Sequence, residues 1–473
     1  MIGYGAGRSI AGAPPLGQTL DLAAPGQLLR RLSSHVLSFE AIFALFVFSS
    51  ALKASGLTSG FPVDPTLMFF ALSVPVGALV ILRDGIYLPG LLIVVLWLLF
   101  AAWAGLSYGW TPARNVYAMT KLRDVVIVNT WTIVAAAMII ASQRIRVYRF
   151  LLFIVILALV MMAVILPRYE SFYAYVSLGG SQHHFSRMAA FGAIVSYVWF
   201  TYARVGSTTW FTSAGLFCLF VVGLFMIGAR SLMVYTFVLL VLPALLGSPT
   251  PTPGKFTIHR AQLQVMVALG LLATAIALIV LTADQLPWTL RRLGNLFDFG
   301  GEGGSAGRGS RLRMRFFEQA IQAWSTSIIM GHGLASYPIV TGSLGVTDVT
   351  GRRYPHNVIL EALSETGLIG GLLLIAVIFV GLRRMSPVRL RTEPVMLACA
   401  MAGLLSLFYS MVSGDFTTFD FVLLFFGLLF LRPPAEEFGG AAASGRVASM
   451  WTSPQPARAP ARVAEVESGP TGG

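Results

Sequence analysis

Charged side chains are scarce in this chain of 473 residues. Only 11% of the residues are Asp, Glu, Lys or Arg, and 56% are hydrophobic; soluble domains carry roughly 25% charged residues. A chain of this composition lacks the polar side chains needed to cover a surface exposed to water. The composition therefore excludes an ordinary soluble protein and predicts a polytopic α-helical membrane protein.

Lysine and cysteine are scarcer still. Lysine occurs only at Lys53, Lys121 and Lys255, so the net charge of +13 comes almost wholly from arginine. Anionic lipid headgroups and the preference of basic residues for the cytoplasmic side account for such a charge, so we expect membrane lipids and no nucleic acid as partners. Cys218 and Cys399 both lie in apolar runs, which argues against a disulfide framework.

The sequence also lacks the common short motifs of nucleotide and metal chemistry. It contains no Walker loop, no G-x-G-x-x-G, no D-x-D, no H-E-x-x-H and no C-x-x-C. The usual residues for ATP, for nucleotide sugars and for a transition metal are therefore missing. We expect no cofactor and no metal site.

Twelve apolar runs have a length close to that of a membrane span, which is about 17–25 residues. Spans must be helical because no alternating pattern of a barrel is present and the backbone must satisfy its own hydrogen bonds in lipid. The predicted fold class is all-α, with twelve transmembrane helices near 38–55, 65–82, 87–107, 124–142, 148–166, 187–204, 209–228, 231–247, 264–282, 366–383, 394–413 and 416–431.

These spans define three predicted regions. Residues 1–37 form a cytoplasmic N-terminal segment without a signal-peptide pattern. Residues 38–431 form the transmembrane domain. Residues 432–473 are rich in Pro, Ala, Gly, Ser and Arg, which predicts a disordered cytoplasmic tail.

Arginines indicate the orientation of the spans. Basic residues gather on connections that all fall on one face, which is cytoplasmic if the positive-inside rule holds: Arg30, Arg31, Arg144, Arg146, Arg149, Lys255, Arg260, Arg383, Arg384, Arg389 and Arg391. The large loop 283–365, between spans nine and ten, is then periplasmic. Arg114, Lys121 and Arg123, in the connection after span three, break the rule and require another reason.

The large loop carries the chemistry that the spans lack. Residues 283–362 contain eight arginines, six carboxylates, two histidines and no lysine. Arginine without lysine suits bidentate capture of phosphate-like oxyanions. We therefore predict that this loop is the working part of the protein and that the spans are its scaffold.

An amphipathic helix is predicted in the loop after Ser310, which is its expected N-cap. Arg311 and Arg315 are four residues apart and share one side, whereas Arg313 falls on a different side and is a weaker candidate. The opposite stripe consists of Phe316, Phe317, Ala320, Ile321, Trp324 and Ile328. The arginines either bind an oxyanion or reach lipid headgroups from a helix at the membrane interface.

Two further arginines lie near the ends of spans. Arg230 stands between two long apolar runs, with no loop to place it in water. Burying an arginine near the membrane costs a few kcal/mol, so an interior or cavity-facing role is the first hypothesis, and a tight outer turn is the alternative. Arg187 opens span six and is a similar case.

His356 is the histidine best placed for proton transfer. It follows Tyr-Pro and precedes Asn357 and a helical run, so it is either a general base at the outer mouth of a span or a helix-entry residue bonded to the backbone. Glu361 and Glu365 share a helical face and could orient a cation or an incoming hydroxyl. Asn357 and His332, which lies between two glycines, are candidates for supporting the site.

The order of these elements resembles the O-antigen ligase/O-antigen polymerase superfamily of bacterial membrane glycosyltransferases. The similar pieces are A-R-S with Arg230, R-x-x-x-R-F-F-x-x-A-x-x-A-W from Arg311, G-x-G at 331–333, and H-N-x-x-L-x-x-L-x-E-x-G-x-x-G from His356. The resemblance spans roughly 38–431. Ala229 stands where the family usually has Ser or Thr.

The resemblance implies transfer of a glycan from an undecaprenyl-diphosphate donor at the periplasmic side of the bacterial inner membrane, without an obligatory metal. It also implies that Arg230 and Arg311 bind the donor diphosphate, with Arg187 and Arg315 as further candidates, and that His356 is the general base. The Y-P-H-N form favours a polymerase of O-antigen, capsule or exopolysaccharide repeat units, which could act with a chain-length regulator. The alternatives are a ligase with lipid A-core as acceptor, a transporter of lipid-linked substrate, and a non-catalytic polysaccharide scaffold that would tolerate loss of His356.

Overall fold

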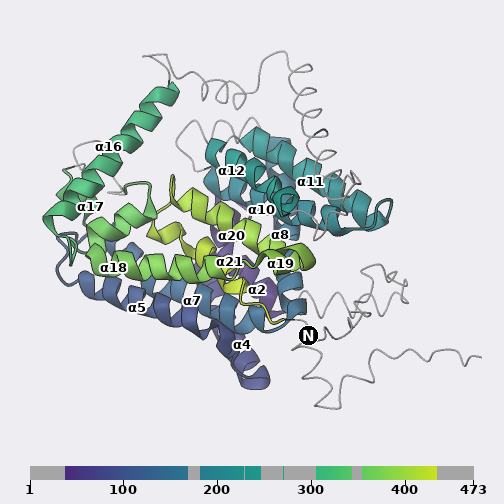
Figure 1. Ribbon diagram of the computed structural model, residues 1–473, viewed down its shortest axis with the longest axis horizontal. Helices are drawn as coiled ribbons and strands as arrows, with labels where there is room; N and C mark the ends of the chain where they lie inside the picture. Colours follow the sequence, from purple (N-terminus) through teal and green to yellow (C-terminus); the bar gives the residue numbers. More distant parts are fainter. Residues whose placement is uncertain are drawn as a thin grey trace, which may run out of the picture. The chain divides into compact units, whose positions relative to one another are not determined.

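The regular structure of this protein is helical. The computed structural model describes residues 38–168, 182–227, 229–246, 270, 305–342 and 354–433, and within these ranges it contains helices and no strand. The chain forms two compact units, Met1–Leu431 and Arg432–Gly473, and all helices below belong to the first (Figure 1). For the described residues the predicted all-α fold class is confirmed.

The helices follow one another through mostly short connections. In chain order they are α2 (Phe39–Val47), α3 (Ser49–Ala54), α4 (Pro65–Asp84), η1 (Leu88–Gly90), α5 (Leu91–Ser107), α6 (Val116–Arg123), η2 (Asp124–Val128), α7 (Asn129–Val134), η3 (Ala135–Ile139), η4 (Ile140–Ser142), α8 (Arg144–Ile165), η5 (Leu166–Arg168), α10 (His183–Tyr202), α11 (Thr208–Ile227), α12 (Arg230–Leu240), α13 (Leu242–Leu245), α16 (Ser305–Thr326), α17 (Tyr337–Val340), α18 (Val358–Arg383), α19 (Pro387–Thr392), α20 (Pro394–Ser410), η7 (Phe416–Thr418) and α21 (Asp420–Leu428).

Most predicted spans coincide with these helices. Six are long and apolar enough to cross a membrane, namely Pro65–Asp84, Leu88–Ser107, Val116–Ser142, Arg144–Ile165, Thr208–Ile227 and Val358–Arg383. The first predicted span is divided at Phe48 into α2 and α3, and the last contains only η7 and α21. The span predicted at 264–282 lies outside the described residues except for Gly270. The count of twelve and the side on which the large loop lies therefore stay predictions.

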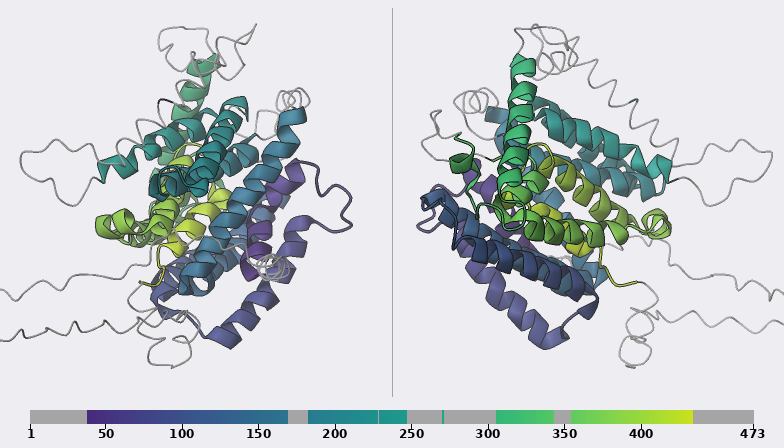
Figure 2. Two further views of the ribbon diagram at one scale, coloured as in Figure 1. Left: turned by 90° about the vertical axis from the view of Figure 1, so that its right-hand side faces the viewer. Right: turned by 60° about the vertical axis from the view of Figure 1, so that its left-hand side comes forward.

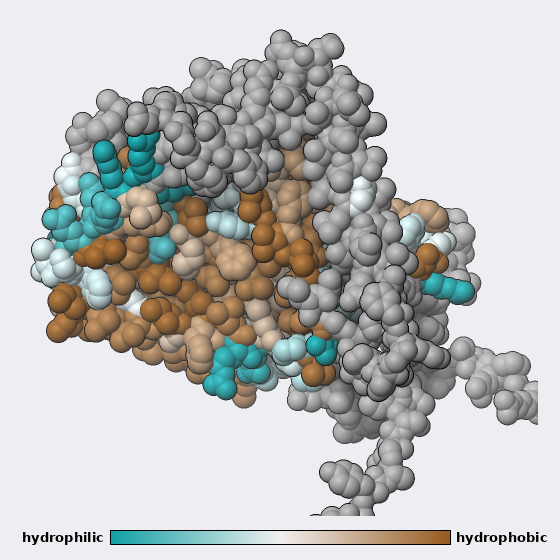
Figure 3. Space-filling model, turned by 45° about the horizontal axis from the view of Figure 1, so that its top comes forward, coloured by the Kyte–Doolittle hydropathy of each residue, from teal (hydrophilic) through white to brown (hydrophobic). Residues whose placement is uncertain are grey.

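One face of the molecule is apolar over a wide area, with hydrophilic residues gathered toward its rims (Figure 3). The span in α4 is the least covered by protein, with 17% of it buried. Leu72, Leu79 and Leu82 on α4 are 48%, 64% and 81% exposed. Because such an area would be unstable in water, it suits the hydrocarbon of a bilayer.

Helix α10 is a central element of the bundle. It packs against α8, α11, α12 and α20, and its residues from Phe185 to Val198 are all buried. Small residues permit this close packing: a Cβ at Gly192 would lie 2.9 Å from both Ala158 and Phe220. Arg187 is therefore held at a fixed place inside the bundle.

Connections predicted on one face of the membrane meet in the structure. Arg144 at the start of α8 pairs with Glu393 just before α20 at 2.7 Å, and Arg146 pairs with Asp84 at the end of α4. We call this part the Arg144 end. The opposite connections meet at the other part, the His356 end, where Thr111 Oγ1 donates to the carbonyl of Leu334 at 2.8 Å. The site described next lies at the His356 end.

Candidate active site at the His356 end

His356 stands immediately before a well-defined helix start. Asn357 is the N-cap of α18, and its Oδ1 accepts the N–H groups of Ile359 and Leu360 at 3.0 Å each. Its Nδ2 donates to the carbonyl of Met411 at 3.2 Å. His356 itself has a φ of 60°, which is unusual for a residue with a side chain. Asn357 therefore fixes the entry of α18, and the imidazole projects from a constrained backbone.

Aromatic side chains surround the imidazole of His356. The Tyr354 ring lies 4.4 Å away and the Phe316 ring stacks on it at 5.8 Å, both measured between ring centroids. The Nδ1 atom is buried without a hydrogen-bond partner among the described residues. Burial and, to a smaller extent, the charge of Arg313 together lower the pKa of His356 to about 4, and Asp415 opposes this shift. The imidazole is thus neutral at pH 7 and can accept a proton.

Helix α16 turns Arg313 toward the bundle. Arg313, Phe316 and Phe317 are half-buried and Ala320 is buried, whereas Arg311 and Arg315 are exposed. The charge of Arg313 reaches His183, Tyr235 and Tyr409 as well as His356. The first turns of α16 extend away from the other helices (Figures 1 and 2).

Two expectations for α16 were wrong. The helix begins at Ser305, so Ser310 lies inside it and is not its N-cap. Ile321 and Ile328, both predicted for the inward stripe, are 50% and 51% exposed. The inward stripe instead contains Arg313, because positions 313, 316, 317 and 320 repeat with helical spacing.

Arg187 lies between two aromatic rings. Its guanidinium carbon is 4.8 Å from the centroid of Tyr409 and 4.4 Å from that of Phe421. No ion pair of the described residues involves it. These residues line a pocket with Leu232 of α12 and Ser406 of α20, and the side chains nearly fill it. The guanidinium also forms a side-chain hydrogen bond with Tyr409. Because an arginine carries five N–H donors, others can still bind an anion.

Arg230 is the first residue of α12, and Ala229, its N-cap, is buried. The side chain of Arg230 lies outside the described part of the structure. Two residues further on, Leu232 lines the pocket of Arg187. The start of α12 is thereby placed next to the candidate site.

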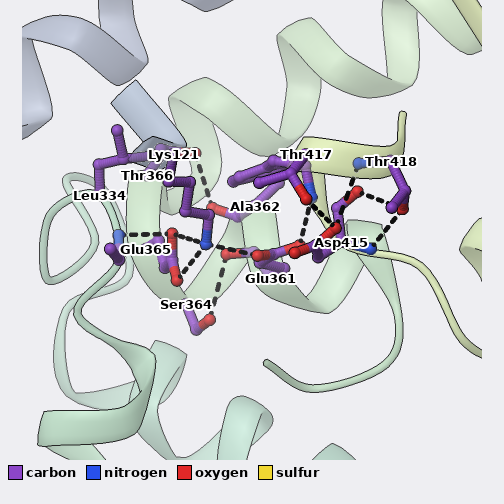
Figure 4. A network of polar contacts seen from close by, with 12 residues as sticks. Lys121, Leu334, Glu361, Ala362, Ser364, Glu365, Thr366, Asp415, Thr417 and Thr418 are labelled. Carbon is purple, nitrogen blue, oxygen red and sulfur yellow. Dashed lines mark hydrogen bonds and ion pairs between the residues drawn. The ribbon is translucent and has the colours of Figure 1, made fainter. Parts of the chain in front are cut away.

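Glu361 and Glu365 do not face solvent. Both are fully buried and share one partner, Lys121 of α6, which is also fully buried (Figure 4). Lys121 Nζ donates to Glu361, and it donates to both oxygens of Glu365 at 2.7 Å. The cation that these carboxylates orient is therefore Lys121, and the geometry leaves no access for an incoming hydroxyl. Removing one partner of such a buried pair typically costs about 3–5 kcal/mol.

The G-x-G motif at 331–333 packs closely against a kink in α18 and is hydrogen-bonded to it. Gly367 has a φ of 69° and interrupts the helix. The carbonyls of Ser364 and Glu365, next to the kink, accept the N–H groups of His332 at 3.1 Å and Gly333 at 2.7 Å. A Cβ at Gly331 would lie 2.4 Å from the nitrogen of Gly367. Only glycine permits this approach of two backbones.

His332 closes the same turn. Its Nε2 lies 2.9 Å from both the Thr326 hydroxyl and the carbonyl of Ala323 at the end of α16. These contacts connect the turn with α16. His332 is therefore bonded to the end of α16, whereas the Nδ1 atom of His356 has no partner in the described part of the chain.

The structure brings some predicted residues together and separates others. His183, at the start of α10, lies within electrostatic range of Arg187, Arg313 and His356. Arg311 and Arg315 lie on the exposed side of α16. From the sequence, Arg313 ranked below Arg311 and Arg315, Lys121 was found only as an exception to the positive-inside rule, and Tyr409 and Asp415 were missed. The helical spacing of Arg313 to Phe316 was the signal for it, whereas Tyr409 and Asp415 gave no local signal.

The comparison with known proteins agrees with this geometry. Residues 183–375 match a family model described as O-antigen ligase, and no curated protein matches the chain. The matched segment begins at the first residue of α10 and includes α12, α16 and the kink of α18. It therefore contains Arg187, Arg230, Arg313 and His356, and for this segment of the chain the match supports a place in the O-antigen ligase/polymerase superfamily.

Proposed function

We propose that this protein transfers a glycan from an undecaprenyl-diphosphate-linked donor to a sugar hydroxyl at the periplasmic side of the bacterial inner membrane. The observation that carries the proposal is that Arg187 and His183 both lie against the Tyr409 ring, 4.8 Å and 5.7 Å from its centroid, while Arg313 and His356 lie within electrostatic range of His183. Two cations and one neutral imidazole are the groups that a diphosphate leaving group and a hydroxyl nucleophile require.

In the proposed reaction the arginines bind the donor diphosphate. Arg230 and Arg187 take this role as the resemblance implies, and on α16 the inward-facing Arg313 takes the place first given to Arg311 and Arg315. The bond between the anomeric carbon and the phosphate oxygen breaks, and the lipid diphosphate leaves with the bonding electrons. Guanidinium groups neutralise the charge that develops on it, so a divalent metal is not required.

His356 removes the proton of the acceptor hydroxyl as the new glycosidic bond forms. Direct attack by this oxygen inverts the configuration of the anomeric carbon. Because the Arg313 charge helps to lower the pKa of His356, a bound diphosphate that offsets this charge makes the imidazole a stronger base. The base is therefore strengthened when the donor is in place.

The Y-P-H-N segment favours a polymerase that joins lipid-linked repeat units, and the family match is compatible with a polymerase and with a ligase. The two reactions share the donor and differ in the acceptor. Purified protein supplied with a single lipid-linked repeat unit makes longer glycans if it is a polymerase. A product only in the presence of lipid A-core identifies a ligase.

The test of the reaction is His356→Ala. Removal of a general base lowers the rate by about 10²–10⁴-fold, whereas donor binding should survive because the arginines provide it. Binding of the lipid-linked donor and transfer of its glycan are measured on the same purified variant. Transfer near the wild-type rate would refute the proposal, and loss of donor binding would place His356 in the diphosphate site instead.

A further inference from the structure

Two residues other than glycine have a left-handed backbone in the described ranges, Ala335 with a φ of 63° and His356 with a φ of 60°. Such a conformation persists only where the surrounding structure holds it. Two chains of contacts connect both residues with one buried side chain, that of Lys121.

The first path of contacts runs through Glu361. Lys121 holds one carboxylate oxygen of Glu361, and the other oxygen accepts the N–H of Phe416 at 3.0 Å. Glu361 thereby fixes the position at which η7 begins. The turn that carries Asp415 precedes this position (Figure 4).

The segment before η7 leads back to His356. The carbonyl of Met411 accepts from Asn357 Nδ2 at 3.2 Å, and the carbonyl of Ser413 accepts from the Tyr354 hydroxyl at 3.3 Å. Asn357 and Tyr354 flank His356 on both sides. The segment 411–416 is therefore held at one end by Glu361 and along its length by the neighbours of His356.

The second path runs through Glu365. Its Oε2 accepts the N–H of Ala335 at 2.8 Å. Two residues later, the Tyr337 hydroxyl donates to the carbonyl of Phe316 at 3.1 Å. Phe316 is the residue of α16 that stacks on the imidazole. Contacts therefore connect Lys121 both with the backbone that carries the imidazole and with the ring that stacks on it.

We propose that Lys121 is a positioning residue for His356 and acts through the two buried carboxylates. The inference rests on the proposed function, because it gives His356 the role of general base. A displacement of about 1 Å in a catalytic group can lower a rate by 10²-fold, so loss of the shared cation should impair transfer more than donor binding.

The chain offers a matched control. Lys53 pairs with Asp64 at 3.0 Å, but these side chains are 40% and 53% exposed, so their pair contributes little. Lys53→Met removes an exposed ion pair with one carboxylate, whereas Lys121→Met removes the buried cation that Glu361 and Glu365 share. The triple variant Lys121→Met/Glu361→Gln/Glu365→Gln avoids uncompensated buried charge, and its glutamines can still accept the two backbone N–H groups.

The assay compares folded amount, donor binding and single-turnover transfer for the wild type, Lys53→Met, Lys121→Met and the triple variant. The ligand is an undecaprenyl-diphosphate-linked oligosaccharide. We expect donor affinity within about threefold of wild type for the triple variant, and transfer per folded protein lowered by about 10²-fold. The acid limb of its pH–rate profile should move upward, because a loosened imidazole is better hydrated. Lys53→Met should match the wild type.

Three results would overturn the positioning role. The first is transfer within threefold of wild type, with an unmoved acid limb, in both Lys121 variants. The second is a loss of binding and transfer in equal proportion, and the third is failure of both variants to accumulate; each of these would assign Lys121 to folding alone. Failure of the proposed function gives a different pattern, since His356→Ala would then transfer at the wild-type rate whatever the Lys121 variants do.

Discussion

Replacing Arg313 should change the pH at which His356 loses its function as a base. Burial is the largest cause of the low pKa of His356, the charge of Arg313 is the second, and Asp415 acts in the opposite direction. Arg313→Gln removes the cation and keeps a side chain of similar length. The pKa of His356 should therefore rise from about 4 toward the ordinary value of 6.5.

The size of the effect follows from the fraction of neutral imidazole. With a pKa of about 4, about 90% of His356 is neutral at pH 5. If the pKa returned fully to 6.5, about 3% would be neutral at that pH, which is a decrease of about 30-fold. Burial persists in the variant, so this figure is the upper bound. At pH 8 the imidazole is neutral in both proteins, and only the loss of donor binding remains.

The assay is the pH dependence of kcat/KM for glycan transfer, because this ratio reports the free enzyme. Samples returned from pH 4.5 to pH 7 must regain their activity, which controls for acid denaturation. Arg315→Gln, two residues away with an exposed side chain, should leave the acid limb where it is. An acid limb that stays near pH 4 in Arg313→Gln, or that moves equally in Arg315→Gln, would refute the reasoning.

Three other outcomes are expected. Gly331→Ala should lower the free energy of unfolding by about 2–5 kcal/mol, because it adds the cost of a left-handed backbone to that of a steric overlap. Gly56→Ala is the control, since Gly56 has a φ of 76° and nothing lies within 4 Å of the added Cβ. It should lose only the cost of the left-handed backbone, about 1–2 kcal/mol, and thermal unfolding measures both variants. Arg230→Lys keeps the charge but loses the bidentate fork, so donor affinity should fall by about tenfold or more; an unchanged dissociation constant would contradict this. A Ser305→Cys variant should react with a membrane-impermeant maleimide in cells with a permeabilised outer membrane, and labelling only after lysis of the inner membrane would reverse the predicted orientation.

Helix positions were predictable because the membrane imposes one rule on the whole chain. Apolar runs of span length must be helical, and the starts of α4, α8 and α20 fall within a few residues of the predictions. The breaks inside spans were not predictable in this way. The division at Phe48 and the kink at Gly367 depend on neighbours in space, and hydropathy does not record them.

The choice among the arginines of α16 shows where local reasoning was insufficient. The sequence predicts an amphipathic helix, and the spacing of Arg311 and Arg315 predicts that these two arginines share its binding face. The structure exposes these two and half-buries Arg313. The spacing of Arg313 to Phe316 and Ala320 is that of an inward-facing stripe. A charged residue in such a stripe indicates a role inside the protein.

Lys121 illustrates a limit of another kind. Its position against the positive-inside rule showed that it needed a reason, and the spacing of Glu361 and Glu365 showed that they could hold a cation. The two observations concern residues 240 and 244 positions apart. Nothing in the local sequence joins them, because the contact exists only after distant helices have packed.

The separation of Lys121 from its carboxylates also has a consequence for synthesis of the protein. Chains are made from the N-terminus, so α6 emerges well before α18 and for that period Lys121 has neither Glu361 nor Glu365 as a partner. An unneutralised lysine is unfavourable in hydrocarbon, so α6 cannot take its final buried place until the tenth predicted span has been inserted. The His356 end of the bundle is therefore completed late, and a nascent chain that stops before residue 361 should leave the region around α6 open to protease.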